Sequence, residues 1–383
     1  MKNIKYVSGM LFLGLLLIIQ ITACGGGGGD AASGPVPGTP FITSDLAGTW
    51  YMYGTNGASV GVPPAGSIDA GNFRGKLFLD ALGQVPITGS SFTRSTNQSV
   101  SFTGGVIGMD SSGAVSGSAT TSLGVYFYFD SGKMDSSKNI LSFVVHTSSN
   151  EYYLVTAIRA MGGFSSLDLA ATWYVFGAGG DYGQITVSDA SNGIRATIAS
   201  PGGGGFFAID GNGLVNDTYS GTSYVNTGSG ALYLKQGKIN MAKDVMTFVA
   251  GTDPTTYDMV AAIRAGGTFT PADLSGTWSV SGSSINAADS TQKATLSGTL
   301  TLDSSGKVTG GSYTRSDTGG KITFTGGTVS IDATGVLSGN ATTDAGGNIT
   351  FASGKMNAAK GMMAMVSGTN SGKIDFLFCV KGN

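Results

Sequence analysis

The chain has 383 residues, of which 64 are glycine, and charged residues make up only 11%. Glu151 is the only glutamate among 23 acidic residues, and aspartate favours turns over helix interiors, so the composition argues against a helical protein. A hydrophobic content of 41% argues against disorder, and a net charge of −2 gives no reason to expect a nucleic-acid partner. We therefore expect a folded all-β protein without a cofactor.

Residues 1–23 have the pattern of an export signal. Two lysines near the start precede an apolar run over residues 7–21, which is short for a membrane span and ends in small residues. The run closes with Ile21-Thr22-Ala23-Cys24, which resembles the lipobox of bacterial lipoproteins. This resemblance implies cleavage before Cys24 and acylation of its thiol, and therefore a lipid-anchored protein of the bacterial cell envelope. The alternative is an ordinary signal peptide with an incidental cysteine.

Residues 24–40 follow as a predicted flexible tether, rich in glycine and proline. Position 25 is Gly rather than Asp, which by resemblance to the sorting rules of Gram-negative lipoproteins permits the outer membrane; the membrane face stays open. With Cys24 acylated, Cys379 is the only remaining cysteine, so no intramolecular disulfide can form. We expect Cys379, in an apolar run, to be a buried and inert thiol.

Three markers recur three times in the same order and predict three tandem domains, 41–162, 163–267 and 268–383. The first marker has the form Phe-x-x-x-Asp-Leu-x-x-Thr-Trp, and its copies end at Trp50, Trp173 and Trp278. The second has the form Gly-Lys-x-(Asp/Asn)-x-x-Lys and begins at residues 132, 237 and 354. The third ends on a cation each time, at Arg159, Arg264 and Lys381. Each domain is long enough for a modest core of its own.

Within each domain the pattern is that of short strands and turns. Apolar alternation followed by Asp-x-x-Gly recurs, and in this turn aspartate bonds the backbone while glycine accepts a positive φ. One helical turn is expected before each Trp, and Thr270-Pro271-Ala272-Asp273 and Ser165-x-x-Asp168 have the pattern of a capping box. Each domain is expected to be an antiparallel meander of about eight strands. In the third domain they are predicted at residues 277–281, 295–303, 308–315, 322–332, 336–343, 349–356, 362–368 and 373–381.

An eight-stranded antiparallel meander can close into a barrel, which removes its exposed edges. Gly-Thr-Trp on the first strand, with a cation on the last of eight strands, resembles the calycin pattern of lipocalins and avidins. The resemblance implies that the cation packs across the Trp at the closed end, where it contributes about 0.5–2 kcal/mol. The implied pairs are Trp50 with Arg159, Trp173 with Arg264, and Trp278 with Lys381. The alternative is an open sheet, or a sheet shared between domains.

The residues offer little chemistry. His146 is the only histidine, so a Ser-His-Asp triad would be confined to one repeat, and we expect a half-exposed strand histidine instead. Zinc and haem sites need more His and Cys ligands than are present, and no Gly-Lys pair is followed by Ser or Thr as a P-loop requires. The aspartates at turns and at the start of each repeat favour structural roles. We therefore predict no catalytic residue and no metal site.

One aromatic run stands apart from the repeats, at residues 125–129, and together with Tyr152 and Tyr153 it is the richest aromatic concentration in the sequence. Strand alternation places Tyr126 and Tyr128 on one face and Phe127 and Phe129 on the other. The tyrosines could form a surface for a ligand or partner, by stacking on sugars or on a protein. The alternative is a strand packed on both faces, against its own core and a neighbouring domain.

These features lead to one functional hypothesis and two alternatives. We expect a lipid-anchored, non-enzymatic binding or structural interaction module of the cell envelope, with a protein or carbohydrate partner and no nucleic acid. The first alternative is a carrier of a small apolar ligand inside calycin-like barrels, which requires small inward side chains that leave a cavity. The second alternative is an aspartate-based hydrolase.

Overall fold

The computed structural model describes an all-β protein, in agreement with the sequence. In the part of the chain that the structure describes, every regular element is a strand apart from three short 3-10 turns. The predicted signal peptide and Cys24 lie outside the described residues, as does most of the tether. Among the residues described, no helix has the length and apolarity needed to cross a membrane. The described residues are 39–59, 72–189, 195–200, 203–216, 224–227, 230–251 and 258–382.

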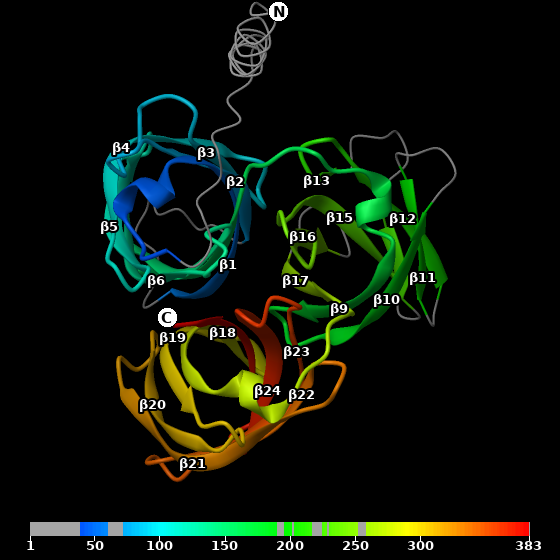
Figure 1. Ribbon diagram of the computed structural model, residues 1–383. Helices are drawn as coiled ribbons and strands as arrows, with labels where there is room; N and C mark the ends of the chain where they lie inside the picture. The colour runs from blue at the N-terminus through cyan, green and yellow to red at the C-terminus, as the bar shows by residue number, and fades with distance from the viewer. Residues whose placement is uncertain are drawn as a thin grey trace, which may run out of the picture. The chain divides into compact units, whose positions relative to one another are not determined.

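Repeat 1 forms a closed antiparallel barrel, called barrel 1 here, which is drawn in blue to teal (Figure 1). Each strand pairs with the next along the chain, and β8 returns to pair with β1, so that Trp50 faces Arg159 across the seam. The strands are β1 (Gly48–Ser59), β2 (Phe73–Leu79), β3 (Ser91–Arg94), β4 (Ser99–Met109), β5 (Ala114–Thr121), β6 (Tyr126–Met134), β7 (Ile140–Thr147) and β8 (Glu151–Arg159).

Repeat 3 forms a second closed barrel, called barrel 3, with all eight predicted strands in place. The main difference from prediction is that the first two strands are longer, because they continue as one extended hairpin. The strands are β18 (Gly276–Asn286), β19 (Asp289–Leu302), β20 (Val308–Arg315), β21 (Lys321–Ile331), β22 (Val336–Thr343), β23 (Asn348–Met356), β24 (Met362–Thr369) and β25 (Lys373–Lys381).

Repeat 2 forms a nine-stranded sheet, called sheet 2, rather than the expected eight strands. The extra strand arises because β13 and β14 are two short strands that both pair with β12 and β15. As in the barrels, the last strand pairs with the first, and β11 also pairs with β12. The strands are β9 (Ala171–Gly177), β10 (Tyr182–Asp189), β11 (Arg195–Ser200), β12 (Gly203–Ile209), β13 (Leu214–Asn216), β14 (Tyr224–Thr227), β15 (Gly230–Ile239), β16 (Val245–Gly251) and β17 (Asp258–Arg264).

The predicted helical turn precedes the first strand of each repeat. The turns are η1 (Thr43–Leu46), η2 (Ser166–Asp168) and η3 (Pro271–Leu274). In the third, the backbone N–H of Thr270 donates to Asp273 Oδ2 at 2.8 Å, as the capping box requires. In the second, the backbone N–H of Ser165 donates to Asp168 Oδ2 at the same distance of 2.8 Å, so both predicted boxes are confirmed.

Bulky side chains fill the interiors of both barrels. Barrel 1 packs an aromatic cluster, including Phe92, Phe102 and Phe127, with ring centroids 5.3–5.7 Å apart. Barrel 3 holds a cavity of about 20 Å³, which is room for about one water molecule. Cys379 is fully buried there, and burial raises the pKa of its thiol to about 12. The expected burial of Cys379 is therefore confirmed.

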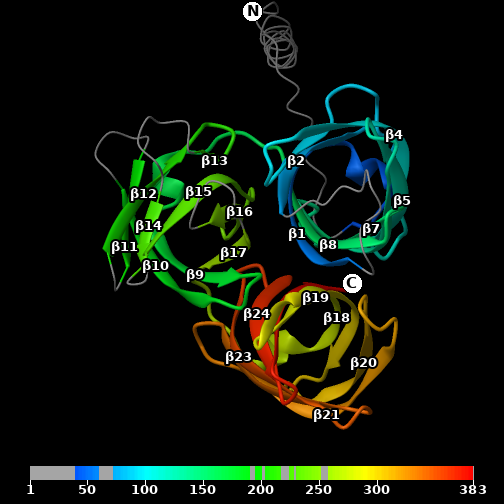
Figure 2. The same ribbon diagram turned by 180° about the vertical axis from the view of Figure 1, so that it is seen from behind.

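The three sheets also share one apolar core outside their own interiors. The last two strands of each repeat are almost wholly buried, because one face points into their own sheet and the other into this shared core. Strands β8, β17 and β24, which contribute to it, can be followed in Figure 2. The shared core includes Tyr53, Leu154, Ile158, Phe176, Val249, Met259, Val366, Phe376 and Phe378.

Tyr53 in the shared core carries a fully buried hydroxyl with no hydrogen-bond partner among the described residues. An unsatisfied buried polar group costs about 1–3 kcal/mol, so Tyr53→Phe is expected to raise the free energy of unfolding by about 1 kcal/mol. Tyr153→Phe is the matched control, because the Tyr153 hydroxyl donates to Glu151 at 3.0 Å and its loss should destabilise the protein. Urea denaturation followed by circular dichroism measures both; an equal loss of stability in the two variants would contradict the prediction.

Candidate functional site

The predicted Trp–cation pairs lie at one end of each sheet. The Arg159 guanidinium carbon is 4.3 Å from the centroid of the Trp50 ring, and Lys381 Nζ is 5.3 Å from that of Trp278. In sheet 2, Arg264 is directly opposite Trp173 across the strand pair. Each indole N–H donates to a leucine carbonyl of the preceding turn, at 2.7–2.8 Å.

The lysines of the second repeated marker close the same ends. The second lysine of each marker pairs with the capping-box aspartate of its own repeat. The first lysine donates to a turn carbonyl, and both lysines lie within 6 Å of the centroid of the first phenylalanine of the repeat. The ion pairs are Lys138–Asp45 at 2.8 Å, Lys243–Asp168 at 2.7 Å and Lys360–Asp273 at 2.9 Å.

This repeated end of each sheet is built for stability. The three tryptophans are fully buried, and burial lowers the pKa of Arg159 to about 10. The guanidinium also donates to the carbonyls of Asp45, Ala47 and Lys138, so its hydrogen-bonding groups are occupied by backbone. A surface for a partner is therefore expected at positions where the side chains differ between the three repeats.

Barrel 1 carries such a surface on the outside of β6, β7 and β8. Tyr126, Tyr128, His146 and Tyr152 form a continuous row of stacked rings, named the aromatic strip here. Centroid distances along the row are 6.1 Å, 4.7 Å and 5.6 Å, and adjacent planes are within 14–27° of each other. His146 Nδ1 also pairs with Asp130 Oδ2, which fixes the imidazole in the row.

The structure shows which face each residue of the aromatic run 125–129 occupies. Phe127 and Phe129 point into the barrel core, whereas Tyr126 is 46% exposed and Tyr128 is half-buried. The tyrosine face is therefore not packed against a neighbouring domain; other outward residues of β7 and β8, namely Ile140, Leu154 and Ile158, form that contact. His146 is the half-exposed strand histidine that was expected, with a side chain 27% exposed.

Barrel 3 does not carry the strip. Counted from the Gly-Lys marker of each repeat, the positions of Tyr126 and Tyr128 correspond to Asn348 and Thr350, which are both exposed on β23. His146 corresponds to Gly368 and Tyr152 to Ile374. The aromatic surface is thus a property of repeat 1 added to a common framework.

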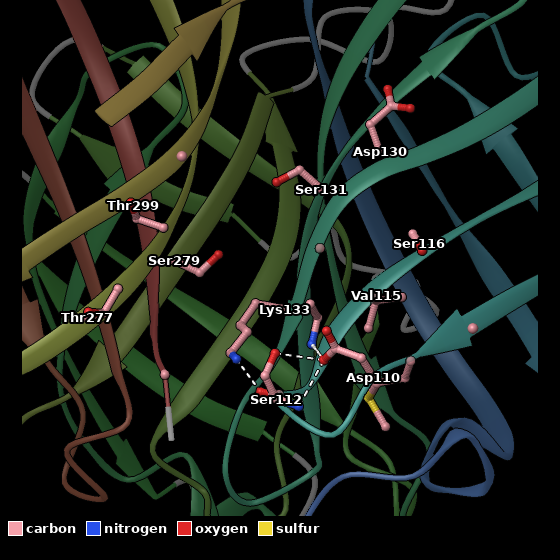
Figure 3. A pocket seen from close by; sticks show the side chains of 16 residues that line it. Asp110, Ser112, Val115, Ser116, Asp130, Ser131, Lys133, Thr277, Ser279 and Thr299 are labelled. Atoms are coloured by element: carbon pink, nitrogen blue, oxygen red, sulfur yellow. Dashed lines mark hydrogen bonds between the residues drawn. The ribbon is translucent and has the colours of Figure 1, made fainter. Parts of the chain in front are cut away.

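A groove of about 630 Å³ lies beside the strip and is named the interbarrel groove here (Figure 3). One wall comes from β4, β5 and β6 of barrel 1, and the other from β18 and β19 of barrel 3. Asp130 lines the groove and also pairs with His146, so it joins the groove to the strip. The polar lining side chains are Asp110, Ser112, Ser116, Asp130, Ser131, Lys133, Thr277, Ser279 and Thr299.

The charged groups of the groove are largely committed to the protein itself. Asp110 Oδ1 accepts hydrogen bonds from the Ser112 hydroxyl at 2.7 Å and from the Ser112 and Ala114 N–H groups at 2.9 Å. These hydrogen bonds, above all the one from the Ser112 hydroxyl, lower the pKa of Asp110, so this carboxyl is a poor proton donor. Lys133 donates to the Ser112 carbonyl, and burial lowers its pKa. The described residues include no group of three metal-ligating side chains.

The sequence indicates only part of this surface. It places Tyr126 and Tyr128 on one face and groups Tyr152 with the same aromatic concentration, but it gives His146 no role beyond a half-exposed strand residue. The contribution of His146 and Tyr152 depends on strand register, because Tyr128 faces His146 and His146 faces Tyr152 across adjacent strands. The groove depends on how two barrels meet and has no signal in the sequence of either repeat.

Comparison with known protein families finds no match, and no curated protein matches the chain. Among solved structures, transferrin binding protein B from Haemophilus parasuis shares 9% identity over 90% of this chain and 76% of that chain, with a TM-score of 0.29. The same protein from Neisseria meningitidis shares 9% over 91% and 77%, with a TM-score of 0.27. A DUF3598 protein of unknown function from Nostoc punctiforme shares 11% over 56% and 97%, with a TM-score of 0.24. These values assign neither a family nor a ligand to this chain.

Proposed function

We propose that the protein is a lipid-anchored, non-enzymatic binding module of the bacterial cell envelope that contacts its partner through the outer surface of barrel 1. The observation that carries the proposal is the partly exposed aromatic strip, which one repeat has and the matched face of barrel 3 lacks. Aromatic side chains bury large areas at low entropic cost and are enriched in binding surfaces.

The anchor belongs to the same proposal. The lipobox supports removal of residues 1–23, acylation of Cys24 and a tether over residues 24–40, with the outer membrane as destination. Two or three acyl chains would hold the protein firmly, since each buried CH₂ contributes about 0.8 kcal/mol. The repeats 41–162, 163–267 and 268–383 would then present their surfaces at a distance from the lipid.

The two alternatives find less support. A carrier needs a hollow barrel, whereas aromatic rings fill barrel 1 and the barrel 3 cavity is about 20 Å³. A hydrolase that uses paired carboxylates needs one with a raised pKa to act as the general acid. In the groove, the pKa of Asp110 is instead lowered by its hydrogen bonds.

Native mass spectrometry of the protein extracted from membranes tests the proposal. We expect acyl chains on Cys24 and no small apolar molecule bound at stoichiometric amounts. A Cys24→Ala variant is the control, and it should be recovered in the soluble fraction. An unmodified N-terminal thiol would remove the anchor, and a retained stoichiometric ligand would favour the carrier.

A further inference from the structure

The aromatic strip and the interbarrel groove meet at Asp130, which pairs with His146 and also lines the groove. We propose that this continuous surface binds a neutral glycan chain, with sugar units in the groove and along the strip. The inference rests on the proposed function and specifies its site and ligand class.

The polar groups of the groove suit a polyhydroxyl ligand. Its volume of about 630 Å³ is within the range of about 300–1,000 Å³ that is usual for small-molecule sites. Hydroxyl side chains both donate and accept hydrogen bonds, and a carboxylate such as Asp130 accepts two or more from vicinal hydroxyls. The hydroxyl side chains come from both walls: Ser112, Ser116, Ser131, Thr277, Ser279 and Thr299.

The charges of the groove favour a neutral chain over an anionic one. Among the described residues that line it, Lys133 is the only one with a cationic side chain, and its ammonium already donates to the Ser112 carbonyl. Asp110 and Asp130 supply the remaining charge. Phosphate, sulfate and carboxylate groups are recognised by clusters of arginine and lysine, which this lining does not offer.

The strand pairing disfavours an extended peptide in the same place. Peptides commonly join a sheet by bonding to an unpaired strand edge. The groove walls are β4–β6 and β18–β19, and each of these strands has a hydrogen-bonded neighbour on both sides within its closed barrel. A glycan needs no strand edge, because its own hydroxyl groups and C–H faces make the contacts.

Tyr126 provides the apolar half of the recognition. It is the outermost ring of the strip and is 46% exposed, so it can pack against the C–H face of a sugar ring. Tyr128 and His146 stack behind it, and Asp130 follows on the same face of β6. A pyranose ring presents an apolar C–H face and hydroxyl groups at its edge. The tyrosine ring suits the C–H face, and the hydroxyl and carboxylate side chains of the groove suit the hydroxyl groups.

Hydroxyl-radical footprinting of the full-length protein, read by mass spectrometry at Tyr126, Tyr128 and Tyr152, tests this proposal. The first probes are short neutral oligosaccharides from glucans, mannans and galactans, with dextran sulfate as the anionic probe. We expect a neutral probe to protect the three tyrosines, and the Tyr126→Ala/Tyr128→Ala variant to bind it about ten-fold more weakly, as the loss of aromatic contacts implies. The matched Asn348→Ala/Thr350→Ala variant of barrel 3 should bind as the wild type does.

A second probe, an envelope fraction before and after periodate oxidation, separates failure of the ligand class from failure of the function. Periodate cleaves vicinal diols, so protection that disappears after oxidation supports a glycan even where no pure oligosaccharide binds. Protection that survives oxidation while no neutral oligosaccharide protects, or protection that only dextran sulfate produces, overturns the neutral glycan while the binding function stands. Absence of protection by every probe overturns both the glycan and the proposed binding surface.

Discussion

Trp50→Ala is expected to lower the free energy of unfolding of barrel 1 by about 3–5 kcal/mol, the usual cost of truncating a buried tryptophan. The ring is fully buried, its N–H donates to the Leu46 carbonyl at 2.7 Å, and Arg159 packs on its face at 4.3 Å. The substitution therefore creates a cavity at the seam between β1 and β8, and it leaves Leu46 without this donor.

Hydrogen exchange resolved by peptide measures where this loss occurs. The loss of protection should be largest in β1–β8 and smaller in β18–β25, where Trp278 still closes the other barrel. Leu82→Ala is the control, because Leu82 is 69% exposed and its truncation should change stability by less than about 0.5 kcal/mol. A loss below about 1 kcal/mol for Trp50→Ala would show that the Trp does not close the barrel.

Lys138→Met is expected to cost about 3–5 kcal/mol, whereas the corresponding Lys360→Met should cost no more than about 1 kcal/mol. The side chains of Lys138 and Asp45 are 2% and 10% exposed, so the substitution leaves a buried carboxylate without its partner. Those of Lys360 and Asp273 are 38% and 18% exposed, so water can replace the lost ammonium. Lys138 also donates to the Thr39 hydroxyl at 2.7 Å, which adds to the difference.

Urea denaturation of Lys138→Met and Lys360→Met measures the two costs. Adding Asp45→Asn alone and the double variant Asp45→Asn/Lys138→Met measures the coupling between Lys138 and Asp45. The same ion pair is thus compared in a buried and a half-exposed setting within one chain. Equal costs for Lys138→Met and Lys360→Met would mean that burial does not determine the strength of this repeated pair.

The local parts of the fold could be predicted because their causes are local. Apolar alternation and the Asp-x-x-Gly turns depend on neighbouring residues, and they placed the eight strands of repeat 3 close to their observed positions. The split of one strand into β13 and β14 was missed, because repeat 2 departs from the common spacing there.

The shared core and the candidate site could not be predicted from the sequence, because both depend on contacts between distant segments. Residues 376–380 are a continuous apolar run, and residues 141–145 and 245–249 are apolar except for Ser142 and Thr247, a pattern typical of strands buried on both faces. Their sequence does not say which surfaces they meet. Likewise, His146 joins Tyr128 only through the register of β6 with β7.

In both barrels the chain arrives and departs on adjacent strands, as the facing pairs Trp50–Arg159 and Trp278–Lys381 show. A whole copy can therefore be gained or lost through gene duplication or deletion without interrupting the hydrogen-bond ladder of another copy. Once the sealing residues are inherited, the exposed outer surface around Tyr126 and Tyr128 can change at little cost to folding, whereas the outward residues of β7 and β8 that enter the shared core cannot. New specificity in such a chain is expected to evolve by substitution of surface residues in one repeat, while the other repeats maintain the stability of the protein.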